Sequence, residues 1–339
     1  MKYAPIMVSV YDRPQHFKAC IESLAQNKDA EKTQLFVSSD GPKDDVTAQK
    51  VAEVREYIKN IKGFKKVYTF CEEENTRGRI RTDVYRRIKS DFRSYIETED
   101  DNIFSPYALN YFNQGLKLFE SNQEIHAICG YMFPGFPASK LEHIYLKCFA
   151  PWGVAHWRDK DIYPNVNEKE FAREAFNNGE IFSKINGSLP HIAPLLQQIS
   201  QGSLEAGDVI RCCHVIKNNQ LCVFPSVSLV RNIGNDGSGQ HCSINPIYGE
   251  QIIADQKIKI ELRKPLKAAN EDMNWITSYY GGQLAVMRGY LIFIECTSKF
   301  VLIKYFFRLL NRLVEFLKIP VRIYKISFNN ARLTKKHWS

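Results

Sequence analysis

Short apolar runs alternate with longer segments of helical spacing over the first 120 residues of the chain. Such runs, bounded by Gly, Pro, Asp and Asn, are typical of buried strands. The strands are predicted at 5–11, 35–37, 66–70 and 94–98. The helices are predicted at 14–26, 45–62, 80–88 and 105–119. This alternation predicts an α/β fold with a mostly parallel, doubly wound central sheet flanked by helices.

The second half of the chain is less regular. Its predicted strands lie at 126–131, 144–149 and 221–224, and its predicted helices at 171–178, 192–201 and 205–217. A Gly-, Ser- and Asn-rich loop follows at 232–243, and loops of this kind usually carry function or lack order. We predict an α/β domain at 1–260 and a helical, basic amphipathic extension at 261–339.

The basic charge of the chain is confined to its C-terminal end. The formal net charge is +9, and residues 299–339 hold ten Lys and Arg against one Glu, so the rest is neutral. A neutral body argues against a nucleic-acid partner. Residues 299–318 form a predicted helix whose apolar sector is too wide for an exposed soluble helix. We expect 299–336 to contact an anionic membrane surface; the alternative is packing against the α/β domain.

Two absences favour a cytoplasmic protein, peripheral on the inner face of the membrane. The start of the chain does not resemble a signal peptide, and the sequence contains no run of 18 uncharged apolar residues. The nine cysteines are scattered without metal-binding spacing, as expected of reduced thiols.

The densest candidate chemistry is the run Glu99, Asp100 and Asp101, directly after a predicted strand. Three adjacent acids repel one another unless a cation neutralises them, and hard divalent ions prefer carboxylate oxygens. Ligands of parallel sheets bind beyond the carboxyl ends of the strands. The run therefore predicts a metal site that would stabilise charge on a leaving diphosphate, although a solvated acidic turn has the same sequence.

Other polar residues also follow predicted strands or occupy loops. The candidates for donor binding, besides the acidic run, are Asp12, Arg13, Asp40, Arg77 and Arg79. The two later arginines belong to a basic cluster that suits a diphosphate, or forms a solvated helix face.

Two further candidates come later in the chain. His241 lies in the Gly-rich loop, and its imidazole suits manganese better than magnesium or calcium. Asp208, one turn from Glu205 near a predicted helix start, could deprotonate an acceptor hydroxyl; acids also favour helix N-termini for structural reasons.

The order of several segments resembles glycosyltransferases with the GT-A fold. The segment 5–14 resembles their first strand and turn, and 95–106 resembles the Glu-Asp-Asp segment of the N-acetylglucosaminyltransferase I type and its bacterial relatives. Residues 126–131 fit the following strand. Residues 150–157 are similar to a Trp-Gly-Trp-Ala-Thr-Trp segment of bacterial surface-polysaccharide sugar transferases, and 225–242 resembles their closing loop.

The resemblance implies roles for the candidates. Asp101 would bind the metal that bridges the donor diphosphate, and His241 matches the late metal-binding histidine of the fold. Asp100 would lie near the ribose or phosphate, while Asp40 and Arg13 would help hold the nucleoside. The implied cofactor is Mn²⁺ or Mg²⁺.

Asp208 matches the catalytic base of the resembled enzymes, which implies inversion at the anomeric carbon. Gly207 stands where relatives have Trp, and Val154 and His156 replace Trp and Thr, so acceptor packing and sugar choice differ from the pattern.

The resemblance implies a metal-dependent hexosyl- or N-acetylhexosaminyltransferase of surface polysaccharide or glycolipid synthesis. It would take a nucleotide-sugar, with a UDP-sugar favoured, and a glycan or lipid-linked acceptor. One alternative is a nucleotidyltransferase acting on sugar phosphates. Such enzymes usually have a Gly-rich phosphate loop after the first strand, and this chain has Tyr11 to Pro14 there, which counts against this alternative. The other is a non-catalytic protein of the membrane surface.

Overall fold

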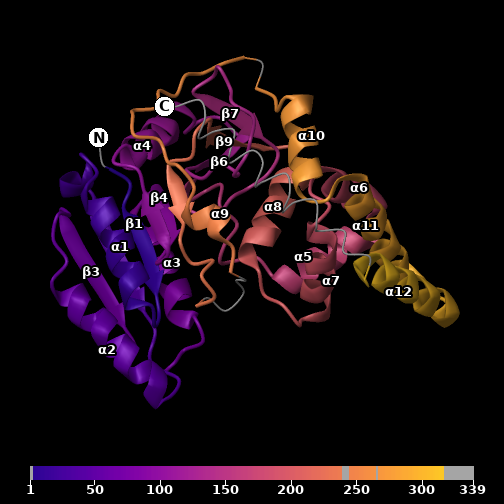
Figure 1. Cartoon of the computed structure of the whole chain (residues 1–339), viewed down its shortest axis with the longest axis horizontal. Coiled ribbons are helices and arrows are strands. Elements are labelled where there is room, and N and C mark those ends of the chain that lie inside the picture. Colours follow the sequence, from indigo (N-terminus) through magenta and orange to yellow (C-terminus); the bar gives the residue numbers. More distant parts are fainter. Residues whose placement is uncertain (1–2, 239–243, 265, 317–339) are drawn as a thin grey trace. The chain divides into compact units, whose positions relative to one another are not determined.

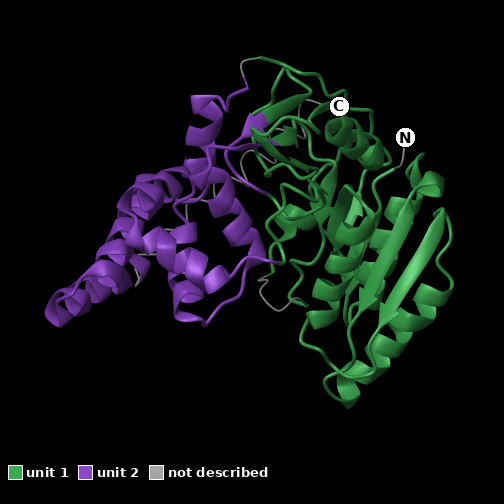
Figure 2. Ribbon diagram, turned by 180° about the vertical axis from the view of Figure 1, so that it is seen from behind, with its two compact units in different colours: residues 1–144, 150–164, 223–264 green, residues 145–149, 165–222, 265–339 purple. Residues whose placement is uncertain are grey.

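The computed structural model describes residues 3–238, 244–264 and 266–316 (Figure 1). The chain divides into two compact units (Figure 2). Unit 1 comprises residues 1–144, 150–164 and 223–264, and unit 2 comprises residues 145–149, 165–222 and 265–339. The domain boundary expected at residue 260 stays a prediction.

The central sheet has the strand order β3-β2-β1-β4-β8-β6-β9-β7, and β10 pairs with β5 in a separate ladder. The strands are β1 (Ile6–Val10), β2 (Gln34–Ser39), β3 (Lys66–Cys71), β4 (Ser94–Glu99), β5 (Asn102–Phe104), β6 (Ile125–Cys129), β7 (His143–Leu146), β8 (Val154–Trp157), β9 (Leu221–Pro225) and β10 (Val230–Asn232). Neighbours among β3, β2, β1 and β4 are parallel, whereas β8 is antiparallel to both β4 and β6.

The predicted fold class is confirmed: the molecule is α/β, with a mostly parallel central sheet flanked by helices. All four strands expected in the first hundred residues are present and parallel. The pattern did not reveal β8, because all four of its residues are buried and show no alternation.

The helices of unit 1 other than α9 (Pro246–Gly249), which has no buried residue, pack apolar side chains inward. These others are α1 (Pro14–Ala25), the 3-10 turn η1 (Ala30–Lys32), α2 (Asp45–Lys59), α3 (Arg79–Asp91) and α4 (Ala108–Leu118). Helix α3 buries Val84 and Ile88 against Met7 of β1 and Phe36 of β2. On α1, Phe17 packs edge-on against Tyr57 of α2, with ring centroids 5.7 Å apart. The core therefore fixes the ends of β1 and β4 where polar residues follow.

One predicted helix start was wrong. Helix α4 begins at Ala108 rather than at Ser105 and Pro106. The amide of Ser105 donates to the carbonyl of Leu229 at 2.8 Å. This bond extends the β5–β10 ladder, so Ser105 stays outside the helix.

Unit 2 is helical over most of its described length. Its helices are α5 (Glu168–Asn177), α6 (Gly179–Ser188), α7 (Ile192–Gln201), α8 (Gly207–Lys217), α10 (Asn270–Tyr279), α11 (Gly282–Thr297) and α12 (Val301–Phe316). The helical character of the C-terminal extension is thus confirmed over 270–316. The core of this unit includes stacked rings of Phe176 and Phe182, with Phe293 of α11 4.7 Å from Phe182 between centroids.

Candidate functional site

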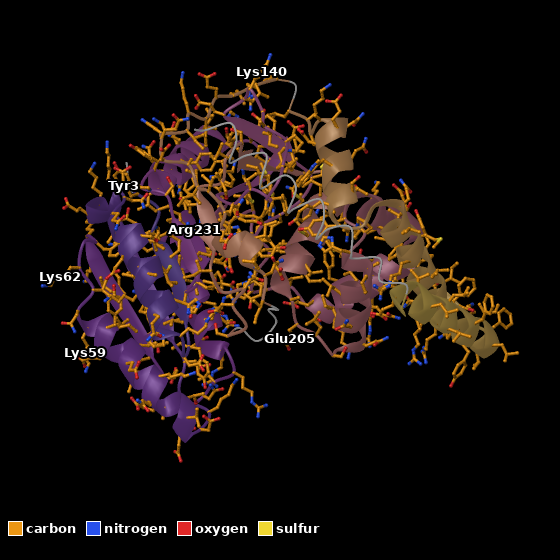
Figure 3. The ribbon with its side chains drawn as sticks, viewed as in Figure 1. Tyr3, Lys59, Lys62, Lys140, Glu205 and Arg231 are labelled. Atoms are coloured by element: carbon orange, nitrogen blue, oxygen red, sulfur yellow. The ribbon has the colours of Figure 1, made fainter. Side chains whose placement is uncertain are left out.

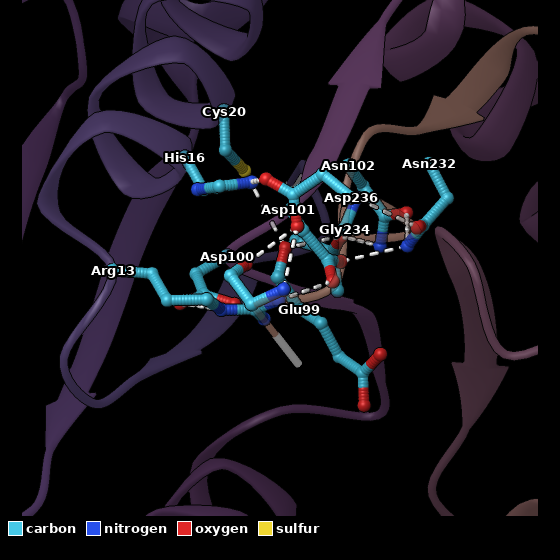
Figure 4. Close-up of polar contacts among 12 residues, drawn as sticks. Arg13, His16, Cys20, Glu99, Asp100, Asp101, Asn102, Asn232, Gly234 and Asp236 are labelled. Carbon is cyan, nitrogen blue, oxygen red and sulfur yellow. Dashed lines mark hydrogen bonds and ion pairs between the residues drawn. The ribbon is translucent and has the colours of Figure 1, made fainter. Parts of the chain in front are cut away.

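The carboxyl ends of β1 and β4 bring three predicted site residues together (Figure 4). Arg13 follows β1, and Asp100 and Asp101 follow β4, its parallel neighbour. Arg13 Nη1 lies 2.9 Å from Asp101 Oδ2, and its Nη2 forms an ion pair with Asp100. The Nε of Arg13 also donates to Asp100 Oδ2 at 3.3 Å. One guanidinium therefore bridges two adjacent carboxylates.

Asp100 and Asp101 are each only 4% exposed. Burial therefore makes it costly in free energy for both carboxyls to be charged. Burial raises the pKa of the Asp100 carboxyl to about 7, with Arg13 opposing the rise and Asp101 adding to it. Burial lowers the pKa of Arg13, but the two facing carboxylates outweigh it and raise that pKa. Arg13 thus compensates the buried negative charge only in part, and the site favours a further cation.

A distant segment covers Asp101. The amide of Ile233 donates to the Asp101 carbonyl at 2.8 Å, and Asn232 Nδ2 donates to Asp101 Oδ1 at 2.8 Å. The Oδ1 of Asn232 in turn accepts from the amide of Gly234 at 2.9 Å. The β5–β10 ladder pairs Asn232 with Asn102 and so sets this register. Asn232 is a site residue that sequence reasoning missed, since its partner is more than a hundred residues away.

Gly234 lets the segment approach the acids. A Cβ at this position would lie 2.0 Å from Asp101 Oδ2 and 2.9 Å from Arg13 Nη1. Next to it, Asp236 Oδ2 lies 3.0 Å from His16 Nε2 of α1 (Figure 4). The predicted ligand His241 lies outside the described residues, five positions beyond this pair.

Asp40 organises a neighbouring loop. Its Oδ1 accepts from the amides of Gly41 and Thr76 and from Thr76 Oγ1, at 2.8–2.9 Å, and its Oδ2 accepts from the amide of Gly78 at 2.9 Å. Burial raises the pKa of Asp40, but these donors outweigh it and lower the pKa. These bonds give Asp40 the role of positioning the loop of residues 75–78. Its predicted contact with a nucleoside stays a prediction.

A hollow of about 560 Å³ lies beside this loop. Arg77 and Arg79 line it with Asn75, Thr76 and residues 71–74. Arg77 has a positive φ of 54°, a conformation rare for a non-glycine side chain. Two of the predicted donor-binding residues thus share one concave surface, while Asp12 lies in the turn between β1 and α1.

Three further arginines that follow closely in the sequence, Arg81, Arg86 and Arg87, have acidic partners. Arg81 pairs with buried Glu97 of β4 at 2.6 Å, and His156 Nε2 of β8 lies 3.4 Å from the same carboxylate. Arg86 and Arg87 pair with acids on their own helix. His156 therefore supports the strand that carries the acidic run.

The candidate base belongs to unit 2. Asp208 lies in the first turn of α8, one turn after Glu205 (labelled in Figure 3), and both are exposed. Glu168 accepts from the amide of Ala206 at 2.8 Å. Burial, together with the charges of Glu205 and Asp208, raises the pKa of Glu168. Glu168, Glu205 and Asp208 thus form an acidic group within unit 2, and Glu168 is a member that the sequence did not indicate.

The carboxylate oxygens of Asp100 and Asp101 are chemically suitable ligands for a divalent cation. Adjacent buried carboxylates supply the oxygen ligands that Mn²⁺ and Mg²⁺ prefer. Within the described ranges, no group of three or more His, Cys, Asp and Glu is arranged to hold a metal. A cation here would therefore take its remaining ligands from the donor phosphates, water or residues outside those ranges.

Comparison with known proteins adds distant structural similarity only. No protein-family model matches the chain, and no curated protein matches it. A crystal structure of S. aureus TarS is 15% identical with a TM-score of 0.33, over 48% of this chain and 30% of that one. S. aureus TarS 1-349 in complex with UDP-GlcNAc is 14% identical with a TM-score of 0.33, over 49% and 47%. This chain thus spans less than half the length of either TarS chain.

A third solved structure has a higher TM-score. Mannosyltransferase PcManGT from Pyrobaculum calidifontis, in complex with GDP-Man and Mn²⁺, is 11% identical with a TM-score of 0.38, over 63% of this chain and 68% of that chain.

Proposed function

We propose that the protein is a glycosyltransferase that moves a sugar from a nucleotide-diphosphate donor to a hydroxyl acceptor. The observation that carries the proposal is the buried pair Asp100 and Asp101 at the carboxyl end of β4, bridged by Arg13. In open α/β sheets this edge is the usual ligand site. The order of motifs that resembles GT-A enzymes supports the same reading.

Each group of the site has a chemical task in this proposal. Asp101, with His241, would hold Mn²⁺ or Mg²⁺, which supplies charge stabilisation to the leaving diphosphate when bound, and Asp100 would lie near the ribose or phosphate. Arg13 offsets part of the negative charge of the two acids and presents guanidinium donors at the same edge. The hollow with Arg77 and Arg79 would take part of the nucleotide. The 232–236 segment would hold Asp101 in place through the bonds from Ile233 and Asn232.

Acceptor activation would fall to Asp208 of unit 2. A carboxylate that removes the acceptor proton leads to direct displacement, and so to inversion at the anomeric carbon. NMR of the glycoside product tests this, since a product with the anomeric configuration of the donor would exclude the proposed displacement.

Thermal unfolding with UDP, GDP or CMP, each with and without Mn²⁺, tests the donor site. Ligand at about 100 times its Kd stabilises the folded state by about 2.7 kcal/mol. We expect one nucleotide to raise the Tm only with metal, and Asp101→Ala to abolish the rise. Asp91→Ala, at the exposed end of α3, is the matched control and should respond as wild type. No shift with any nucleotide would contradict the proposal.

Product analysis separates the proposal from a nucleotidyltransferase. A glycosyltransferase releases nucleoside diphosphate from the nucleotide-sugar, whereas a nucleotidyltransferase makes pyrophosphate from a nucleoside triphosphate and a sugar phosphate. The short turn from β1 to α1 through Arg13 and Pro14, without a Gly-rich loop, favours the former.

A further inference from the structure

Helices α11 and α12 form an antiparallel hairpin held by polar contacts (Figure 1). Arg308 donates from Nε to Glu295 Oε1 at 2.8 Å. Arg288 donates from Nε to Asn311 Oδ1 at 2.9 Å and pairs with Glu315 at 3.1 Å. Glu295 is 6% exposed and Asn311 9%. The two helices therefore exchange polar contacts across the hairpin, beside the partly buried apolar residues Phe307, Leu310 and Val314.

The opposite face of α12 is an apolar stripe. Leu302, Phe306, Leu309 and Leu313 recur at intervals of four, three and four residues, which places them on one side of a helix. Their exposed fractions are 84%, 57%, 59% and 52%. An α-helix turns by roughly 100° per residue. Around the axis of α12, Leu302 therefore lies directly opposite Asn311, and the other three stripe residues lie within roughly 40° of that direction. The stripe thus points away from α11.

The exposed side of α12 is thus apolar, whereas a surface helix of a water-soluble domain turns its apolar side inward and a polar side to solvent. Polar side chains paired between helices, with apolar side chains outward, are the arrangement that a lipid environment favours. Water penalises the exposed stripe, whereas the interfacial region of a bilayer does not.

The positive charge near the stripe indicates which kind of surface the stripe contacts. Lys299, two residues before α12, and Arg312, on α12, are both exposed. The sequence after residue 316 adds six Lys and Arg and no acid. A second copy of the chain in a symmetric interface would bring these like charges together, while anionic lipid headgroups attract them.

We propose that the stripe of Leu302, Phe306, Leu309 and Leu313 inserts into the interface of an anionic lipid bilayer. The contacts of Arg288 with Asn311 and of Arg308 with Glu295 hold α12 in the orientation that presents the stripe, and Lys299 and Arg312 beside it bind headgroups. This proposal does not depend on the donor chemistry. It does not require a membrane-spanning segment, and no helix of the described chain is long and apolar enough to cross a membrane.

Flotation with vesicles tests the proposal on the full chain. Vesicles of phosphatidylcholine alone and with a third of phosphatidylglycerol are compared for wild type and a variant with all four stripe residues changed to Ser. The matched control changes three exposed apolar residues of unit 1 to Ser: Leu141, Ile252 and Leu262. We expect wild type and control to float with the anionic vesicles, and the stripe variant to partition about 100-fold less.

Two results would overturn the proposal. If the stripe variant floats as wild type does, the basic residues alone bind the vesicles. If no protein floats, and sedimentation shows wild type associating where the stripe variant stays monomeric, the stripe covers a second copy instead. Circular dichroism of the stripe variant checks that it folds. Its nucleotide-dependent Tm shift is read separately, so loss of membrane binding and loss of donor binding are distinguishable.

Discussion

Gly234→Ala perturbs the candidate site through a single methyl group. The added Cβ would lie 2.0 Å from Asp101 Oδ2, 2.8 Å from its Cγ and 2.9 Å from Arg13 Nη1. Since ordinary contacts begin near 3.5 Å, the 232–236 segment or the carboxylate must move by about 1 Å or more. The shift strains the hydrogen bond from Asn232 to Asp101, now 2.8 Å long.

The expected loss follows from that contact. A hydrogen bond to a charged group contributes about 1.5–3 kcal/mol, so metal-dependent nucleotide affinity should fall about 10- to 100-fold. Overpacking of this kind costs about 1–3 kcal/mol in folding stability. Titration calorimetry with nucleotide and Mn²⁺, beside thermal unfolding without ligand, measures both.

Gly187→Ala is the matched control. Gly187 lies in helix α6, and a Cβ added there would have no atom within 4 Å. It should unfold at or slightly above the wild-type temperature. If Gly234→Ala matches wild type in both unfolding temperature and affinity, the close approach of this segment to Asp101 is not a feature of the protein in solution.

Three further predictions concern charged groups. The raised pKa of Asp100, about 7, means that the folded state binds a proton more tightly than the unfolded state, so this group lowers stability as pH rises from about 4 to 7. In EDTA, Asp100→Asn should therefore gain stability relative to wild type at pH 8 and lose that gain near pH 4; urea unfolding at both pH values measures it, and a constant difference refutes it. Asp40→Ala leaves the amides of Thr76 and Gly78 without their acceptor and should destabilise by about 2–3 kcal/mol. Because the pKa of Asp40 is lowered, its contribution should vanish as pH falls below about 4; a variant with wild-type stability at pH 7 would disprove this. Asp208→Asn should reduce sugar transfer about 10²- to 10⁴-fold without changing nucleotide binding, whereas Glu205→Gln should retain most activity; equal losses in both would reject Asp208 as the base.

Much of the α/β architecture was readable from the sequence. Strand–helix alternation gave β1 to β4 with their helices, because short buried runs and amphipathic segments are local patterns. Their parallel pairing then placed Arg13 and the 99–101 run at one edge of the sheet. That part of the candidate site needs only local residues and the rule that parallel strands share a carboxyl edge.

Tertiary structure decided what covers the acids. Asn232 and Gly234 reach Asp101 through the β5–β10 ladder, whose strands of three residues each carry too little pattern to be seen. The antiparallel insertion of β8 beside β4 was equally hidden, since strand neighbours far apart in sequence are chosen by packing and not by local preference.

Helix α12 shows most clearly what the sequence determines and what only the tertiary structure decides. Residues 299–318 predicted a helix with a wide apolar sector, and this helix is confirmed as α12 over 301–316. The sequence could not say which side faces the protein. Only the contacts of Arg288 with Asn311 and of Arg308 with Glu295 show which side of α12 meets α11, because a side chain's environment depends on the partner that the fold brings to it.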